Sequence, residues 1–112
     1  MNKEIAKKWV EALRSGEYDQ YEHGSIPLRE GDTYSAPGVL CDLYDDDGWC
    51  RAGSAWSGVT LFEFSGECYS IPLSVLKEAE MEFGFESKIS EMEEQGKTFL
   101  EIADEIERTM DE

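Results

Sequence analysis

Apolar residues recur at helical spacing near the start of the chain. The positions i, i+4, i+7 and i+8 are taken by Ile5, Trp9, Ala12 and Leu13, and charged residues surround them. This spacing places the apolar side chains on one face of a helix and leaves the charged side chains in water. Ser15-Gly16 follows, and a glycine at this point is typical of a helix end. The pattern predicts an amphipathic helix over residues 3–14.

A second clear helical pattern lies at the C-terminal end. Thr98 and Glu101 match a capping box, in which each side chain accepts a hydrogen bond from the backbone N–H of the other residue. An apolar stripe with the period of a helix follows the box and consists of Phe99, Ile102, Ala103, Ile106 and Met110. We therefore predict a helix over residues 98–110.

Residues 72–95 predict two shorter helices. Pro72 suits the first turn of a helix, because its missing N–H is not needed there. Four apolar residues then share one face, namely Leu73, Leu76, Ala79 and Phe83, before Gly84 ends the helix. The second short helix covers residues 87–95 and is closed by Gly96.

The residues with the strongest preference for β-strands lie in the middle of the chain. Residues 59–64 and 67–71 flank Ser65-Gly66, which predicts an antiparallel hairpin with a tight turn. Residues 17–36 are interrupted often by Gly and Pro, so we expect a connecting segment with one short strand. Residues 39–44 are a short apolar run that we interpret as helix rather than strand.

The predicted fold class is α+β: a small single domain over residues 1–112, with an N-terminal helix, a central antiparallel β-hairpin or small sheet, and a helical C-terminal third.

The charge of the chain is strongly negative and unevenly distributed. The 112 residues have a formal net charge of -16, and residues 78–112 hold thirteen acidic and three basic residues, which places -10 there. Such a field repels nucleic acid and anionic lipid and attracts basic partners. We therefore expect a basic protein surface as the partner, with no direct nucleic-acid contact and no membrane. Charges interrupt the N-terminal MNKEIAKKWV, so we expect no signal peptide and a cytoplasmic location.

The residues that could carry chemistry do not assemble a catalytic pattern. The one histidine, His23, lacks a neighbouring nucleophile motif, and the chain has neither a P-loop nor a GxGxxG sequence. Cys41, Cys50 and Cys68 form no CxxC pair, so we expect reduced, buried thiols rather than a zinc site or a disulfide framework. We predict a protein that is not an enzyme and that requires no cofactor and no metal.

Two acidic groups are candidate partner-binding features. The first is a negative face on the last two predicted helices, formed by Glu91, Glu93, Glu94, Glu101, Asp104, Glu105, Glu107 and Asp111. Helical neighbours three or four residues apart are ~5–6 Å from one another, which is similar in scale to the phosphate spacing of nucleic acid. The second is an acidic turn, Asp45-Asp46-Asp47, which lacks the alternation of a calcium loop. Solvation of amphipathic helices also explains the first group without any partner.

Several phrases along the chain resemble a family of small uncharacterised proteins from tailed-phage genomes. In order, they are WVEALRSGEY at residues 9–18, LREGDTY at 28–34, GVLCDLY at 38–44, Ile71-Pro72 and QGKTFLEIADEIE at 95–107. Ser35-Ala36-Pro37 departs from the Cys-Cys-Leu run of those relatives. The resemblance implies a viral origin and the host cytoplasm, and it transfers no activity and no site.

These observations predict a phage-encoded acidic protein that inhibits a host nucleic-acid-handling protein of anti-phage defence, such as a CRISPR effector, by partial nucleic-acid mimicry. One alternative is a nucleotide sponge, in which aromatic residues stack on the ligand beside Arg51; the candidates are Tyr34, Trp49, Trp56 and Tyr69. Another is a structural or assembly protein of the phage, including a homodimer formed through the apolar face of residues 98–110.

Overall fold

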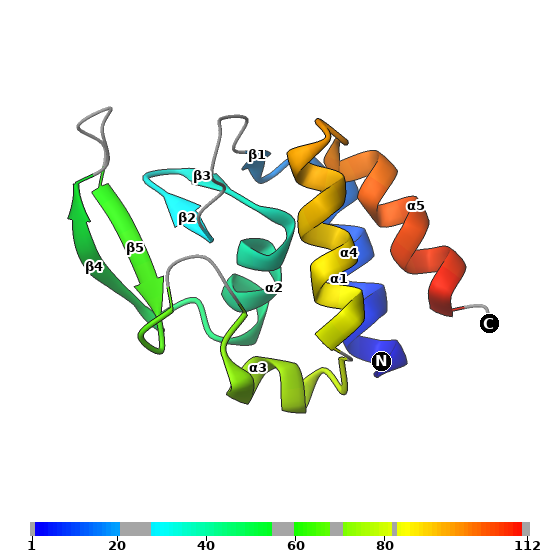
Figure 1. Ribbon diagram of the computed structural model, residues 1–112, viewed down its shortest axis with the longest axis horizontal. Coiled ribbons are helices and arrows are strands. Elements are labelled where there is room, and N and C mark those ends of the chain that lie inside the picture. Colours follow the sequence, from blue (N-terminus) through cyan, green and yellow to red (C-terminus); the bar gives the residue numbers. More distant parts are fainter. Residues whose placement is uncertain (1, 21–27, 55–59, 68–70, 82, 111–112) are drawn as a thin grey trace.

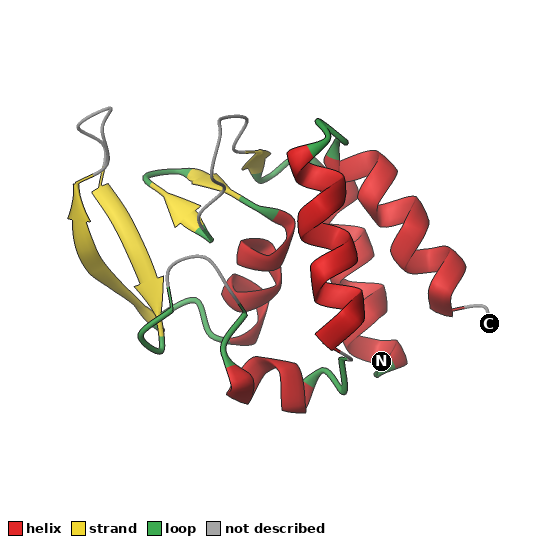
Figure 2. Cartoon of the chain, viewed as in Figure 1, coloured by secondary structure: helices red, strands yellow, loops and turns green. Residues whose placement is uncertain are grey.

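The computed structural model describes residues 2–20, 28–54, 60–67, 71–81 and 83–110. The elements run in the order α1 (Lys3–Ser15), β1 (Asp19–Gln20), β2 (Arg29–Glu30), β3 (Thr33–Tyr34), α2 (Ala36–Tyr44), β4 (Trp49–Ser54), β5 (Thr60–Phe64), α3 (Leu73–Glu78), α4 (Phe83–Glu94) and α5 (Phe99–Met110). Helices α1, α4 and α5 form one end of the molecule, the β4–β5 hairpin forms the other, and α2 lies between them (Figures 1 and 2). The fold is α+β, as predicted.

Helices α1 and α5 pack against each other, although they are the first and last elements of the chain. The Asn2 side chain caps α1 by accepting hydrogen bonds from the N–H groups of Glu4 and Ile5 at 2.9 and 3.2 Å. The helix ends at Gly16, whose φ of +79° is the left-handed conformation that glycine adopts without strain. The buried face of α1 consists of Ala6, Trp9, Val10 and Leu13. The predicted N-terminal helix is confirmed.

The capping box of α5 is formed as predicted. The Glu101 N–H donates to the Thr98 hydroxyl at 3.2 Å, and the Thr98 N–H donates to the Glu101 carboxylate at 3.3 Å. Behind this cap, the stripe residues Phe99, Ile102, Ala103 and Ile106 are all buried. This face, on which one of the alternatives placed a homodimer interface, packs on α1 within one chain. Self-association itself stays a prediction.

The sheet has five short strands in the order β1-β3-β2-β5-β4. β1 is parallel to β3, and the other pairs are antiparallel. The segment that we expected to hold one strand thus supplies three strands of two residues each. Residues 21–27, with His23, lie outside the described residues.

Strand β5 corresponds to the first arm of the predicted hairpin. β5 pairs with the preceding β4 on one side and with β2 on the other, and Phe62 lies opposite both Arg51 and Arg29. Both edges of β5 are therefore occupied at Phe62. At the Ser65-Gly66 turn, Phe64 and Glu67 form an antiparallel bridge, and residues 68–70 of the predicted second arm lie outside the described residues.

The predicted helix over residues 72–83 is shorter than expected. α3 ends at Glu78, and Glu80 adopts a φ of +54°, so the chain turns before α4 begins at Phe83. Gly84 consequently lies in the first turn of α4 and does not end a helix. Leu73, predicted on the buried face, is 65% exposed, while Val75 and Leu76 are buried.

Helix α2 confirms the interpretation of residues 39–44 and lies very close to Leu28, the residue before β2. A Cβ atom on Gly38 would meet the Leu28 carbonyl oxygen at 1.7 Å, so only glycine fits at this position. The indole N–H of buried Trp9 donates to the Ala36 carbonyl at 2.9 Å and ties α1 to the start of α2. These contacts hold α2 at the centre of the core.

Candidate functional site

Arg14 links α1 to the acidic side of α5. Its guanidinium donates to Asp104 at 2.7 Å and to Glu107 at 2.9 Å, which lie 90 and 93 positions further along the sequence. The hydrogen bonds to Glu107 and Asp104 raise the pKa of Arg14. The Asp104 and Glu107 side chains are still 75% and 50% exposed, so this ion-paired group faces solvent.

Glu105 is the most strongly paired carboxylate of α5. It accepts hydrogen bonds from Arg108 on the same helix and from Lys88 on α4. The bonds from Arg108 and Lys88 lower the pKa of Glu105 to about 2. This carboxylate therefore joins α4 to α5 and is not free to receive a partner's cation.

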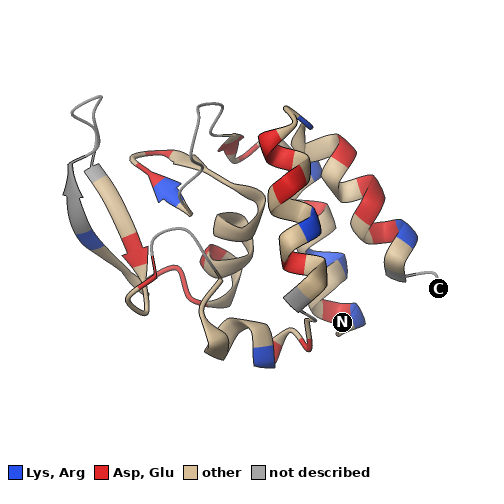
Figure 3. Ribbon diagram, viewed as in Figure 1, with Lys and Arg blue, Asp and Glu red and all other residues tan. Residues whose placement is uncertain are grey.

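Two predicted members of the acidic face stand exposed without a cation. Among the described residues, no lysine or arginine forms an ion pair with Glu91 or Glu94, whereas Glu101 pairs with Lys97 at 3.6 Å. Counting Glu91, Glu94, Glu101, Asp104, Glu105 and Glu107 against Arg14, Lys88, Lys97 and Arg108, six negative and four positive charges leave a net of -2 on this surface. Red and blue segments accordingly share these helices in Figure 3. Asp111 lies outside the described residues.

Glu93 does not belong to the exposed face on which it was predicted. Its side chain is buried, with 6% of the residue exposed, and it accepts a hydrogen bond from the Ala36 N–H at 3.0 Å. The Gln20 amide lies 3.4 Å from its other oxygen. Burial raises the pKa of Glu93 to about 7, while the hydrogen bonds from Ala36 and Gln20 act in the opposite direction. Glu93 is thus an internal bridge from α4 to α2 and β1.

The buried carboxylates of α4 share a helical spacing that sequence reasoning missed. Glu86, Ile89 and Glu93 stand at i, i+3 and i+7, and all three are buried. Glu86 accepts a hydrogen bond from the Ile71 N–H at 2.8 Å, which parallels the bond from Ala36 to Glu93. The position of these two glutamates in an apolar stripe is the signal that could have identified them.

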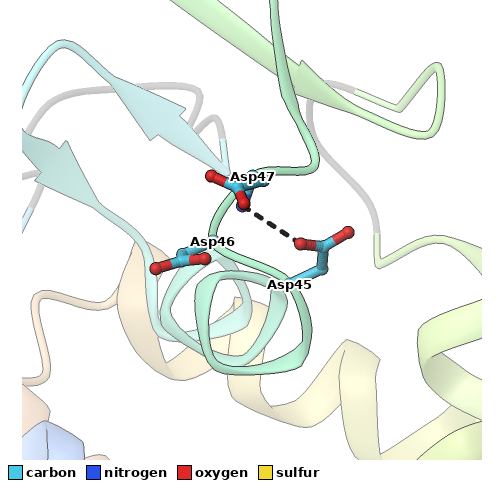
Figure 4. Close-up of side chains that lie close together, drawn as sticks. All are labelled: Asp45, Asp46 and Asp47. Atoms are coloured by element: carbon cyan, nitrogen blue, oxygen red, sulfur yellow. Dashed lines mark hydrogen bonds between the residues drawn. The ribbon is translucent and has the colours of Figure 1, made fainter.

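The acidic turn Asp45-Asp46-Asp47 directly follows α2. All three residues are exposed, and one carboxylate oxygen can be chosen from each so that the three lie within 4.8 Å of one another (Figure 4). The Asp47 N–H donates to the Asp45 carboxylate at 3.1 Å. Among the described residues, no lysine or arginine pairs with these aspartates. Within the described part of the chain, the turn is a local concentration of negative charge with no ion-pair partner.

An aromatic cluster surrounds Arg29 on the sheet. Its guanidinium lies over the rings of Tyr34, Trp49 and Phe62 at 5.1, 5.6 and 4.2 Å from their centroids. Asp42 accepts hydrogen bonds from the Tyr18 hydroxyl at 2.6 Å and from the Trp49 indole at 3.0 Å. Burial, and then the bond to Asp42, raise the pKa of Tyr18. Two of the aromatic residues predicted to stack on a nucleotide are thus already in contact with Arg29.

An apolar pocket of about 240 Å³ lies between α1, α2 and α3 and was not predicted. The residues that line it are Ile5, Lys8, Leu40, Leu43, Tyr44, Val75, Glu78 and Ala79. Leu40, Val75 and Ala79 belong to the buried core, whereas Leu43 and Tyr44 are 40% and 46% exposed. Tyr44 immediately precedes the acidic turn, so the pocket and the turn adjoin.

A family model described as Domain of unknown function (DUF8296) matches residues 1–85. The chain belongs to this family. The matched region contains every residue that lines the pocket and the whole acidic turn, whereas most of α4 and all of α5 follow it. No curated protein and no solved structure matches the chain. Among the described residues, no helix has the length and apolar character needed to cross a membrane.

Proposed function

We propose that this protein is a phage-encoded, non-catalytic acidic binding protein that covers the basic surface of a host nucleic-acid-handling protein of anti-phage defence. The observation that carries the proposal is the net charge of -16 on 112 residues, with carboxylates exposed at both ends of the fold. A field of this sign raises the rate of encounter with a basic surface and repels nucleic acid. The resemblance to tailed-phage proteins supports the host cytoplasm as the setting.

The ion pairs of α5 limit how closely this protein can mimic the charge of nucleic acid in this proposal. With a net of -2 on the α4–α5 surface, its carboxylates do not form a dense array of phosphate-like charges. We therefore propose partial mimicry, in which Glu91 and Glu94 contact partner cations directly. Asp104 and Glu107 contribute through their exposed oxygens while bound to Arg14.

Affinity capture from a lysate of the bacterial host tests this function. The tagged protein should retain a basic, nucleic-acid-binding protein that added DNA displaces and that high salt removes. The double variant Glu91→Gln and Glu94→Gln should retain less of it. The matched control, Glu11→Gln and Glu17→Gln, changes two exposed glutamates of α1 and the segment after it by the same charge. Capture of no basic protein, or equal loss in both double variants, would contradict the proposal.

A further inference from the structure

We infer that the pocket between α1, α2 and α3, together with Asp45, Asp46 and Asp47, docks a basic amphipathic segment of a partner protein. One apolar side chain of that segment enters the pocket, and its lysine or arginine side chains contact the three aspartates. The inference rests on the proposed function only in requiring a basic partner. It places the contact on a surface separate from Glu91 and Glu94.

The size and lining of the pocket favour a protein side chain as the occupant. Its volume of about 240 Å³ is below the range of roughly 300–1,000 Å³ that is usual for small-molecule sites. Buried Leu40, Val75 and Ala79 supply an apolar lining, and the exposed parts of Leu43 and Tyr44 extend it outward. A pocket that receives one anchoring side chain is a common centre of a protein–protein interface.

The charges beside the pocket favour a basic segment over an acidic one. Asp45 follows Tyr44 directly, and the three aspartates of the turn have no cation partner among the described residues. The turn also stands at the C-terminal end of α2, where the helix dipole adds partial negative charge. Lys8 and Glu78 both line the pocket and cancel formally, so the aspartates set the local sign. The apolar and acidic features thus lie side by side, as in a surface that binds a basic amphipathic helix.

A fluorescein-labelled peptide of leucine and lysine at helical spacing is a suitable probe. Its fluorescence anisotropy should rise on binding to the protein at roughly 0.15 M salt, and the affinity should fall as salt increases. Leu43→Asn should weaken binding about tenfold by removing an apolar contact at the pocket. The triple variant Asp45→Asn, Asp46→Asn, Asp47→Asn should weaken binding and flatten its salt dependence. The side-chain amide oxygen at position 45 can still accept from the backbone N–H of residue 47.

Matched controls separate this docking from nonspecific attraction. Leu100 is 59% exposed on α5, so Leu100→Asn removes a comparable leucine away from the pocket and should leave binding within about twofold of the unaltered protein. The Glu91→Gln, Glu94→Gln variant should also bind the peptide normally, although the proposed function requires it to capture less host protein. Peptide binding without host capture would therefore contradict the proposed function alone.

Three results would overturn the inference. The first is a peptide that does not bind the unaltered protein, whatever the capture experiment gives. The second is equal weakening by Leu43→Asn and Leu100→Asn, which would show that the leucines act only through general hydrophobicity. The third is a concentration-dependent dimer that Leu43→Asn abolishes, since this would assign the pocket to a second copy of the chain.

Discussion

The Glu93 carboxylate accepts a hydrogen bond from the Ala36 N–H at 3.0 Å inside the core. Ala36 is the first residue of α2, so this bond supplies one of the backbone partners that a helix start lacks. The arrangement places an ionisable group with a pKa of about 7 where α4 meets α2. The stability of the fold is therefore coupled to pH near neutrality.

Stability should decrease as pH rises from about 4.3 to about 7 through the contribution of Glu93. In this window the folded state keeps a proton on Glu93 that the unfolded state has released. The contribution is then unfavourable above pH 7, and a shift of this size corresponds to roughly a few kcal/mol. Glu93→Gln keeps an acceptor for Ala36 and cannot ionise, so its stability relative to the unaltered protein should increase with pH. Urea unfolding of both proteins at several pH values measures the difference between their free energies of unfolding. If this difference does not change with pH, Glu93 is not the source of the pH dependence.

Gly38→Ala should destabilise the protein by several kcal/mol or prevent folding. The added Cβ would lie 1.7 Å from the Leu28 carbonyl oxygen, and neither backbone segment can move without disturbing the core. Gly84→Ala is the matched control because a Cβ there meets nothing within 4 Å and alanine is the better helix former. It should stabilise the protein by roughly 0.5–1 kcal/mol. Thermal unfolding of the two variants checks both signs, and a tolerated Gly38→Ala would refute the contact between α2 and Leu28.

Sequence reasoning succeeded where the signal was local. α1 and α5 have long apolar stripes with a cap or a glycine at a defined place, and both were predicted close to their observed bounds. The Thr98 capping box needs only four neighbouring residues, so its hydrogen bonds follow from the sequence itself.

Features that depend on distant partners were missed or misplaced. β5 was recognised as a strand, but its pairing with β2 and β4 depends on segments that contain only weak strand patterns. Gly84 was interpreted as the end of a helix. It lies in the first turn of α4 instead, because the chain already turns at Glu80. Glu93 was assigned to the surface by residue type, whereas its bond to Ala36 can be formed only in the folded chain.

The two described cysteines should differ sharply in reactivity. Cys41 is fully buried on α2, and burial, with a smaller effect of Glu86, raises the pKa of its thiol to about 12. Cys50 on β4 is exposed, contrary to our prediction of buried thiols. Because the thiolate is the reactive form, Cys50 should react with a thiol reagent at neutral pH and Cys41 should react only after unfolding.

The variant Cys50→Ser allows this assignment to be measured by mass spectrometry of the labelled peptides. It should remove labelling at position 50 in the native protein and leave the peptide that contains Cys41 unmodified. Cys68 lies outside the described residues, so its peptide is counted separately. Rapid labelling of Cys41 in the folded variant would contradict its place in the core.

Removing Arg14 should strengthen binding to a basic partner if the α5 carboxylates contact it. Arg14→Gln leaves Asp104 and Glu107 without their cation, which makes this part of the α4–α5 surface more negative. Lys7→Gln is the matched control: Lys7 is exposed on α1, and among the described residues it forms no ion pair. Both substitutions change the formal net charge from -16 to -17, so long-range attraction is altered equally.

The comparison therefore distinguishes a local contact from a general effect of charge. With the captured host protein as ligand, Arg14→Gln should lower the dissociation constant more than Lys7→Gln does, and the gap should shrink at high salt. Arg14→Gln should also lower thermal stability, because it removes the ion pair that joins α1 to α5. Equal changes in affinity for the two variants would mean that overall charge, rather than the α5 surface, governs binding. In that case the contact would have to be sought elsewhere on the protein, beginning with the acidic turn after α2.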